Sequence, residues 1–242
     1  MDIPVIILAG GRGSRILEET QKIPKPMVKI GSKPILWHIM RIYSLQGFNR
    51  FIIATGYKRN IIEDWVLETT KQDEWGFSCN PVCFDTGLET QTGGRILKIF
   101  HKFADQRFLM TYGDGLANVN LNKLISTHNR LKKLATITSV RPPARFGNIV
   151  SSKEVVTHFG EKNQASAGWI NGGFFVLERE VQRFINFDHQ PFEYEPISGL
   201  VAERQLATYR HNGFWHPMDT LREKIQLEKY ATENVPPWFI LE

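Results

Sequence analysis

The sequence predicts an α/β fold in which a mainly parallel central sheet is flanked by helices. Three short apolar runs, residues 5–9, 51–55 and 108–112, are each followed directly by a glycine. Uninterrupted apolar runs of this length indicate strands that are buried on both faces of a sheet. Between the first two runs, residues 34–47 place apolar side chains at helical spacing and stop at Gly47. This strand, helix and strand form a βαβ unit, which predicts parallel strands and a right-handed crossover.

The alternation of helices and strands continues to the end of the chain. Further helices are expected at residues 60–70, 93–103, 121–131, 178–185 and 195–203, and further strands at 82–84, 135–140, 148–150, 155–159, 172–177 and 206–210. Thr220 and Glu223 have the spacing of a capping box, which predicts the start of the last helix. No linker or repeat interrupts the 242 residues, so residues 1–242 are expected to form a single domain.

The composition argues against several classes of protein. No apolar run reaches the length of about 18 residues that a membrane helix needs, and the start Met1-Asp2 does not resemble a signal peptide, so the expected location is the cytoplasm. The formal net charge of +5 comes from interspersed acidic and basic residues. No nucleic-acid partner is expected, because no stripe of Lys and Arg is present. This balance suits a small polyanionic substrate.

The first strand ends in a glycine-rich loop, Gly10-Gly11-Arg12-Gly13-Ser14-Arg15. Glycines allow a loop to curl and direct several backbone N–H groups at an anion. The loop matches neither the Walker A motif nor the dinucleotide fingerprint, whose last glycine is replaced by Ile16. A tight turn with solvent-facing arginines is the alternative. Two arginines in the loop, followed by Lys22 and Lys25, favour a cradle for a nucleoside triphosphate.

Two aspartates are candidate metal ligands. Asp114 follows a predicted buried strand and lies between Gly113 and Gly115, at the sheet edge where ligands bind in parallel α/β folds. Asp219 precedes the capped last helix. Together these two carboxylates could hold Mg²⁺. Each also has a structural alternative, since Asp114 could be a turn residue and Asp219 could stabilise the helix N-terminus.

The second half contains polar residues that could bind a sugar phosphate, although surface charges and a turn explain them equally simply. A lysine such as Lys162 can neutralise a phosphate, and Glu161, Asn171 and Glu195 can accept or donate hydrogen bonds to sugar hydroxyls. Neither a nucleophile elbow nor a Cys–His pair is evident, so covalent catalysis is not indicated. A phosphate oxygen needs no base to act as a nucleophile, which points to phosphoryl or nucleotidyl transfer.

Residues 8–15, followed by Pro24-Lys25-Pro26-Met27, resemble the signature of the sugar-1-phosphate nucleotidyltransferases. Residues 31–40, 111–115, 145–147, 170–177 and 213–220 resemble the cytidylyltransferase branch of that family, whose members act on glucose 1-phosphate. The resemblance covers nearly the whole chain. It implies a Rossmann-like core, with a nucleotide-binding half at about residues 1–140 and a smaller, strand-rich sugar-phosphate-binding half at about 141–242.

The resemblance also implies an activity and a set of site residues. CTP and α-D-glucose 1-phosphate would give CDP-glucose and pyrophosphate, with Mg²⁺ as cofactor, for surface polysaccharide precursors of the O-antigen type, and the protein would be a homo-oligomer. Catalysis would involve Arg15, Lys25 and Asp114, and Mg²⁺ would be bound by Asp114 and Asp219. The nucleotide would contact Leu8, Ala9, Gly10, Gly11, Gly13, Ser14, Arg15, Gly94 and Asp114. The sugar phosphate would contact Gly147, Glu161, Lys162, Asn171, Gly172 and Glu195.

The chain departs from the family pattern at three places. Ser14 replaces the usual threonine, Asn163 replaces a proline after Lys162, and the segment 71–92 is shorter. Because the last of these lies near the base in the family, a different nucleoside triphosphate or a different phosphorylated acceptor stays open. A non-catalytic nucleotide-sugar sensor on the same fold is a further alternative, but the complete set of charged residues favours an enzyme.

Overall fold

The computed structural model describes residues 3–13, 16–142, 148–152, 154–160 and 168–240. Within these residues, eight strands form a central sheet in the order β11-β8-β12-β6-β1-β4-β5, with β13 also paired to β8. Their bounds are β1 Val5–Leu8, β4 Arg50–Thr55, β5 Asn80–Asp85, β6 Arg107–Tyr112, β8 Ala135–Val140, β11 Ile170–Asn171, β12 Phe175–Glu178 and β13 Leu206–Arg210. The expected parallel pairing of the first two apolar runs is confirmed, since β1 lies parallel to both β4 and β6.

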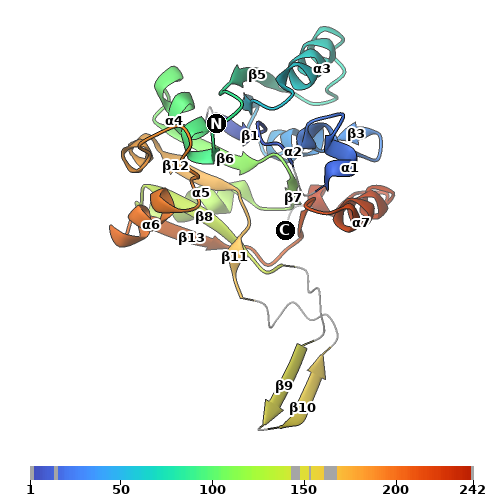
Figure 1. Ribbon diagram of the computed structural model, residues 1–242, viewed down its shortest axis with the longest axis vertical. Helices are drawn as coiled ribbons and strands as arrows, with labels where there is room; N and C mark the ends of the chain where they lie inside the picture. The colour runs from blue at the N-terminus through green and yellow to red at the C-terminus, as the bar shows by residue number, and fades with distance from the viewer. Residues whose placement is uncertain (1–2, 14–15, 143–147, 153, 161–167, 241–242) are drawn as a thin grey trace.

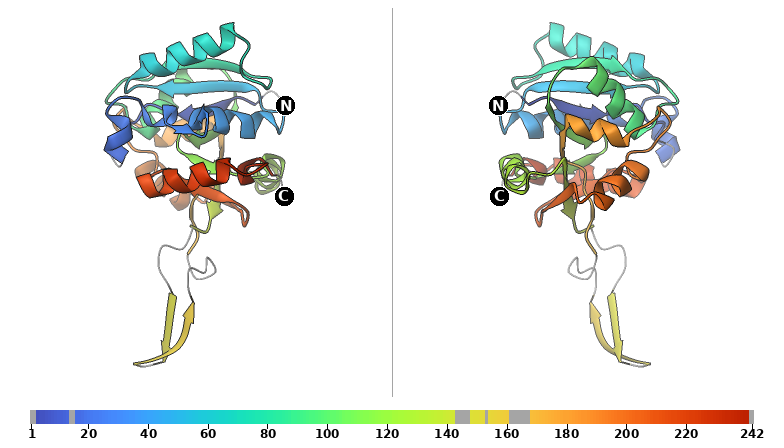
Figure 2. Two further views of the ribbon diagram at one scale, coloured as in Figure 1. Left: turned by 90° about the vertical axis from the view of Figure 1, so that its right-hand side faces the viewer. Right: turned by 90° about the vertical axis from the view of Figure 1, so that its left-hand side faces the viewer.

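Helices cover both faces of this sheet (Figures 1 and 2). The side chains of β1 show why: Val5 and Ile7 belong to the apolar cluster that contains α2, whereas Ile6 and Leu8 belong to the cluster that contains α4. A strand whose two faces are both buried must be apolar at every position. The helices are α1 Leu17–Thr20, α2 Ile35–Ser44, α3 Arg59–Lys71, α4 Thr92–Lys102, α5 Leu121–Leu131, α6 Glu195–Ala202 and α7 Leu221–Ala231, with short 3₁₀ helices at Lys25–Met27, Arg179–Phe184 and Pro237–Phe239.

Strand β12 makes the sheet mixed. It inserts between β6 and β8 and runs antiparallel to both. Strands β11 and β13, from the same half of the chain, pair with β8. The mixed, mainly parallel sheet expected from the sequence is therefore confirmed, and its strands come from both halves of the chain.

In the described part of the chain, three two-stranded ribbons accompany the central sheet. β2 Lys29–Ile30 pairs with β3 Lys33–Pro34, and β7 Gly115–Ala117 pairs with β14 Trp215–Pro217. The third ribbon, β9 Asn148–Ser152 with β10 Val155–Gly160, projects from the body at the end opposite to β5 (Figure 1), and both views in Figure 2 show the same projection. The β7–β14 ribbon matters most for function, because β7 begins directly after Asp114 and β14 ends two residues before Asp219.

Two sequence-based boundaries need correction. The strand expected at 172–177 begins only at Phe175, because Gly173 and Phe174 have left-handed backbone angles, with φ of 77° and 47°. The helix expected at 178–185 is a 3₁₀ helix at Arg179–Phe184. The capping box is confirmed, with the Thr220 side chain accepting from the Glu223 backbone N–H and the Glu223 side chain accepting from that of Thr220. No described helix is long and apolar enough to cross a membrane.

Candidate active site

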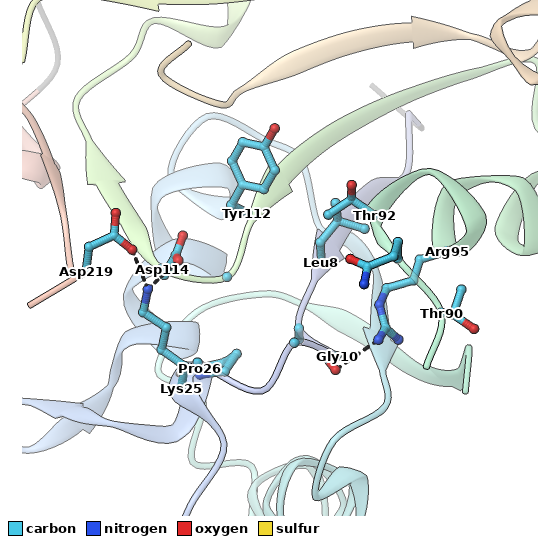
Figure 3. A pocket seen from close by; sticks show the side chains of 15 residues that line it. Leu8, Gly10, Lys25, Pro26, Thr90, Thr92, Arg95, Tyr112, Asp114 and Asp219 are labelled. Carbon is cyan, nitrogen blue, oxygen red and sulfur yellow. Dashed lines mark hydrogen bonds and ion pairs between the residues drawn. The ribbon is translucent and has the colours of Figure 1, made fainter. Parts of the chain in front are cut away.

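A cavity of about 340 Å³ opens at the carboxyl ends of β1 and β6, the edge where parallel α/β sheets bind ligands. Its walls come from the glycine loop, the segment around Lys25, the start of α4, and the turns that hold the two aspartates (Figure 3). The lining residues are Leu8, Ala9, Gly10, Gly11, Gly13, Lys25, Pro26, Thr90, Gln91, Thr92, Arg95, Tyr112, Gly113, Asp114 and Asp219. The structure therefore brings the described part of the predicted phosphate cradle together with both predicted metal ligands.

Lys25 lies between the two aspartates. Its Nζ is 2.6 Å from Asp114 Oδ2 and 2.8 Å from Asp219 Oδ1, as Figure 3 shows. Only 10% of the lysine side chain is exposed. Burial alone lowers the pKa of Lys25, but the charges and hydrogen bonds of Asp114 and Asp219 outweigh it, so the pKa is raised above 10.5. The ammonium group therefore stays charged at neutral pH.

The backbone explains why these three side chains meet. Pro24 and Pro26 restrict the segment that carries Lys25, which forms a short 3₁₀ helix. One residue separates Asp114 from the end of β6, and one residue separates Asp219 from the end of β14. Pairing of β7 with β14, together with a 2.8 Å hydrogen bond from the Met218 N–H to the Asp114 carbonyl, brings the two carboxylates to the same place.

The two carboxylates fit a divalent cation. One oxygen of each carboxylate contacts Lys25 Nζ, so the two carboxylates lie close enough together to share a cation, and carboxylate oxygens are ligands that Mg²⁺ prefers. No group of three or more His, Cys, Asp or Glu side chains that could hold a metal is found in the described part of the chain. A site with two carboxylates suits Mg²⁺, because Mg²⁺ commonly keeps water and substrate phosphates as its remaining ligands.

Arg95, which the sequence did not single out, is hydrogen-bonded to the backbone of the glycine loop. Its guanidinium donates to the Gly10 carbonyl at 2.9 Å and to the Thr55 and Gly87 carbonyls at 3.0 Å. A Cβ on Gly10 would lie 2.1 Å from Arg95 Nη1, so a side chain at position 10 would displace this guanidinium. Burial lowers the pKa of this guanidinium, with an opposing contribution from Asp85. The available signal was an arginine directly after Gly93-Gly94.

Tyr112 and Thr92 lie on the side of the pocket away from Lys25 and Gly10 (Figure 3), and both belong to a second group of polar side chains. The carboxylate of Glu193 accepts from the Tyr112 hydroxyl at 2.8 Å and from the Thr92 hydroxyl at 2.6 Å. Asn171 Nδ2 donates to the Tyr112 hydroxyl at 3.0 Å. Burial, followed by the charge of Glu193, raises the pKa of Tyr112. This side of the pocket therefore carries hydroxyl and carboxylate groups, which suit a sugar better than a phosphate.

The remaining predicted residues are distributed unevenly. Asn171 joins the Tyr112 network, and Gly172 packs against Val140 while its carbonyl accepts from the Trp215 indole at 2.8 Å. Glu195 is exposed at the start of α6, and its neighbour Glu193, which the sequence did not single out, reaches Tyr112 instead. Gly94 is buried in α4 against the Asp188 backbone and does not line the cavity. The predictions for Ser14, Arg15, Gly147, Glu161 and Lys162 fall outside the described residues.

The fold and the pocket define a class of protein. A sequence profile of the family described as "Nucleotidyl transferase" matches residues 4–220. The chain therefore belongs to the nucleotidyl transferase family, and the resemblance to sugar-1-phosphate nucleotidyltransferases is confirmed.

Similar proteins of known name indicate which members of this family the chain resembles. The chain is 39% identical to the glucose-1-phosphate cytidylyltransferase of Salmonella typhi, over 96% of this chain and 97% of that protein. It is 30% identical to the D-glycero-α-D-manno-heptose 1-phosphate guanylyltransferase of Aneurinibacillus thermoaerophilus, over 73% and 75% of the two chains. The fold is similar to that of HddC from Yersinia pseudotuberculosis complexed with GMP-PN, with a TM-score of 0.72 and 22% identity over 95% of this chain and all of that one.

Proposed function

We propose that this protein is a cytidylyltransferase that joins CTP and α-D-glucose 1-phosphate to give CDP-glucose and pyrophosphate. The observation that carries the proposal is the meeting of Lys25, Asp114 and Asp219 at the mouth of the glycine loop, in a chain 39% identical to a glucose-1-phosphate cytidylyltransferase over nearly its whole length. The product would serve surface polysaccharide synthesis of the O-antigen type. Both substrates are metabolites of the cell interior, which favours the cytoplasmic location expected from the sequence.

The reaction needs charge neutralisation more than acid–base chemistry. An oxygen of the sugar phosphate forms a bond to the α-phosphorus of CTP, the bond from that phosphorus to the bridging oxygen breaks, and pyrophosphate leaves with its electron pair. Lys25 supplies a fixed positive charge beside the α-phosphate, and the backbone N–H groups of the glycine loop, with Arg15, hold the phosphates that leave. Asp114 and Asp219 hold Mg²⁺, which neutralises charge on the phosphate oxygens when bound.

The side of the pocket that carries Tyr112 and Thr92 suits the sugar of the sugar phosphate. Asn171, Gly172 and Glu195 remain the proposed sugar contacts, together with Gly147, Glu161 and Lys162 from the sequence. The proposed nucleotide contacts are Leu8, Ala9, Gly10, Gly11, Gly13, Ser14, Arg15 and Asp114, and the family resemblance alone adds Gly94. The hydroxyl and carboxylate groups of Tyr112, Thr92 and Glu193 support this division, because acceptor-only carboxylates repel phosphate and accept hydroxyl hydrogens.

A different nucleoside triphosphate or phosphorylated acceptor is the alternative within the class. It is favoured by the short segment 71–92 and by the similarity to a guanylyltransferase. A non-catalytic nucleotide-sugar sensor is the alternative from another class.

Incubation with each nucleoside triphosphate, Mg²⁺ and glucose 1-phosphate, followed by detection of released pyrophosphate, decides among these possibilities. We expect release with CTP well above the other three. Release with another triphosphate, or only with another sugar 1-phosphate from a panel, would support the first alternative. Tight binding of CTP without release under any combination would support the sensor.

Self-association also belongs to this proposal. A two-stranded ribbon on its own is only marginally stable in water, yet β9–β10 projects from the body with Val155 69% and Val156 54% exposed. A second copy of the chain would cover these side chains. Light scattering should give a mass of at least two chains of 27.9 kDa each, and a monomer at micromolar concentration would contradict the expected homo-oligomer.

A further inference from the structure

Arg12 is the cation of the glycine loop to which the proposed mechanism assigns no role. Its Nη2 atom is 2.5 Å from Oε1 of Glu89, 77 residues away in the chain. Gly11 and Gly13, on either side of Arg12, line the cavity, and so do Thr90 and Gln91 directly after Glu89. This ion pair, whose own two side chains are not among the lining residues, therefore connects two segments that both line the pocket.

Three other described cations near this pocket already have several partners. Lys25 contacts both aspartates, and Arg95 is 3% exposed and donates to the carbonyls of Gly10, Thr55 and Gly87. Lys98 contacts the Thr86 carbonyl, the Thr90 hydroxyl and Asp188. A triphosphate that enters the pocket therefore finds these cations engaged with protein groups.

Arg12 differs from these cations in its exposure to solvent and in the number of N–H donors that it can offer to a phosphate. The Arg12 side chain is 60% exposed and that of Glu89 is 78% exposed, so water screens the pair and its separation costs little. A guanidinium carries five N–H donors and matches phosphate oxygens in a two-point geometry. The carboxylate of Glu89, by contrast, would repel a phosphate placed near Arg12.

We propose that Arg12 binds the terminal phosphates of the nucleoside triphosphate, and then the pyrophosphate product, by exchanging Glu89 for them. Glu89 is the resting partner: it holds Arg12 at the pocket in the empty protein and competes with pyrophosphate for it after the reaction. This inference rests on the proposed nucleotidyl transfer, and it adds Arg12 to the residues proposed to bind the phosphates.

The test compares ligands with and without terminal phosphates. Isothermal titration in Mg²⁺ buffer measures the affinities of CTP, pyrophosphate and CMP for the wild type, Arg12→Gln and Glu89→Gln. Because hydrogen bonds to charged groups are strong, Arg12→Gln should weaken CTP and pyrophosphate about 10- to 100-fold and leave CMP within about twofold. Glu89→Gln should tighten pyrophosphate a few-fold, since it removes the competitor. Lys102→Gln, at the exposed end of α4, removes one positive charge, as Arg12→Gln does. It should leave the affinities for CTP, pyrophosphate and CMP unchanged.

Two results would overturn the inference. One is an unchanged pyrophosphate affinity in Arg12→Gln, and the other is an equal loss for CMP, which would mean that the loop has changed shape. Failure of the proposed function is visible separately, because the wild type itself would then bind neither CTP nor pyrophosphate. If the protein uses a nucleoside triphosphate other than CTP, the predicted effect of Arg12→Gln on pyrophosphate affinity is unchanged.

Discussion

Two glycine clusters in this chain have opposite uses. Both Gly10-Gly11 and Gly93-Gly94 stand near the start of a helix, and local sequence predicts ligand contact for each. A Cβ on Gly11 would meet nothing within 4 Å, and Gly11 lines the cavity. A Cβ on Gly94 would lie 2.0 Å from the Asp188 carbonyl oxygen. Gly11 leaves space for a ligand, whereas Gly94 leaves space for the chain itself.

The same contrast applies to charged groups. Lys25, Asp114 and Asp219 face the cavity, and the acidic pair is about one third exposed. His128, Glu178 and Arg107 form another compact group, in which His128 Nε2 lies 2.9 Å from Glu178 Oε1 and His128 itself is 1% exposed. The members of the second group contact one another, and none of them lines the cavity. Whether a polar cluster is functional therefore depends on what fills the space beside it.

The largest expected effect that tests this contrast is on stability. Gly94→Ala should lower the free energy of unfolding by about 1–3 kcal/mol, because overpacking of that size is usual when a methyl group meets rigid backbone. Its folded fraction should bind CTP as the wild type does. Urea denaturation and CTP titration measure the two quantities.

Gly11→Ala is the matched substitution and should behave in the reverse way. It should change stability by less than about 0.5 kcal/mol but weaken CTP binding, because the added methyl group would occupy space beside the phosphates. If Gly94→Ala folds normally and loses CTP affinity, the base-proximal role implied by the family resemblance is right and the packing interpretation is wrong.

A smaller effect concerns acid stability. Burial raises the pKa of Glu178, but hydrogen bonds and charges from His128 and Arg107 outweigh it and leave the pKa below the ordinary value of 4.5. A carboxylate with a lowered pKa contributes stability above its unfolded pKa and loses it as the pH falls through the folded value. The wild type should therefore exceed Glu178→Gln in stability by about 1–3 kcal/mol at pH 7, and the difference should shrink below pH 4.5. A difference that stays constant down to pH 3 would contradict the ionic role.

The sequence predicts those parts of the fold that local patterns determine. Strands β1, β4 and β6 are found where uniform apolar runs indicate them, and the capping box begins α7. The insertion of β12 antiparallel between β6 and β8 depends on long-range pairing, for which no local pattern exists.

The site divides in the same way. Lys25, Asp114 and Asp219 are predictable, because a proline-flanked lysine and two aspartates after strands carry local signals. Arg95 and Glu193 are not, because their importance comes from contacts with residues 85 and 81 positions away.

The most direct test of the reaction centre is the kinetic split in Lys25→Ala. If Lys25 neutralises charge that develops on the α-phosphate, kcat should fall about 100- to 1,000-fold, in the range seen when one preorganised electrostatic contact is removed. The dissociation constant of CTP, measured by titration, should change by less than about tenfold, because the other phosphate contacts remain. Equal losses in turnover and binding, or turnover that survives intact, would contradict the role of Lys25 at the centre of this site.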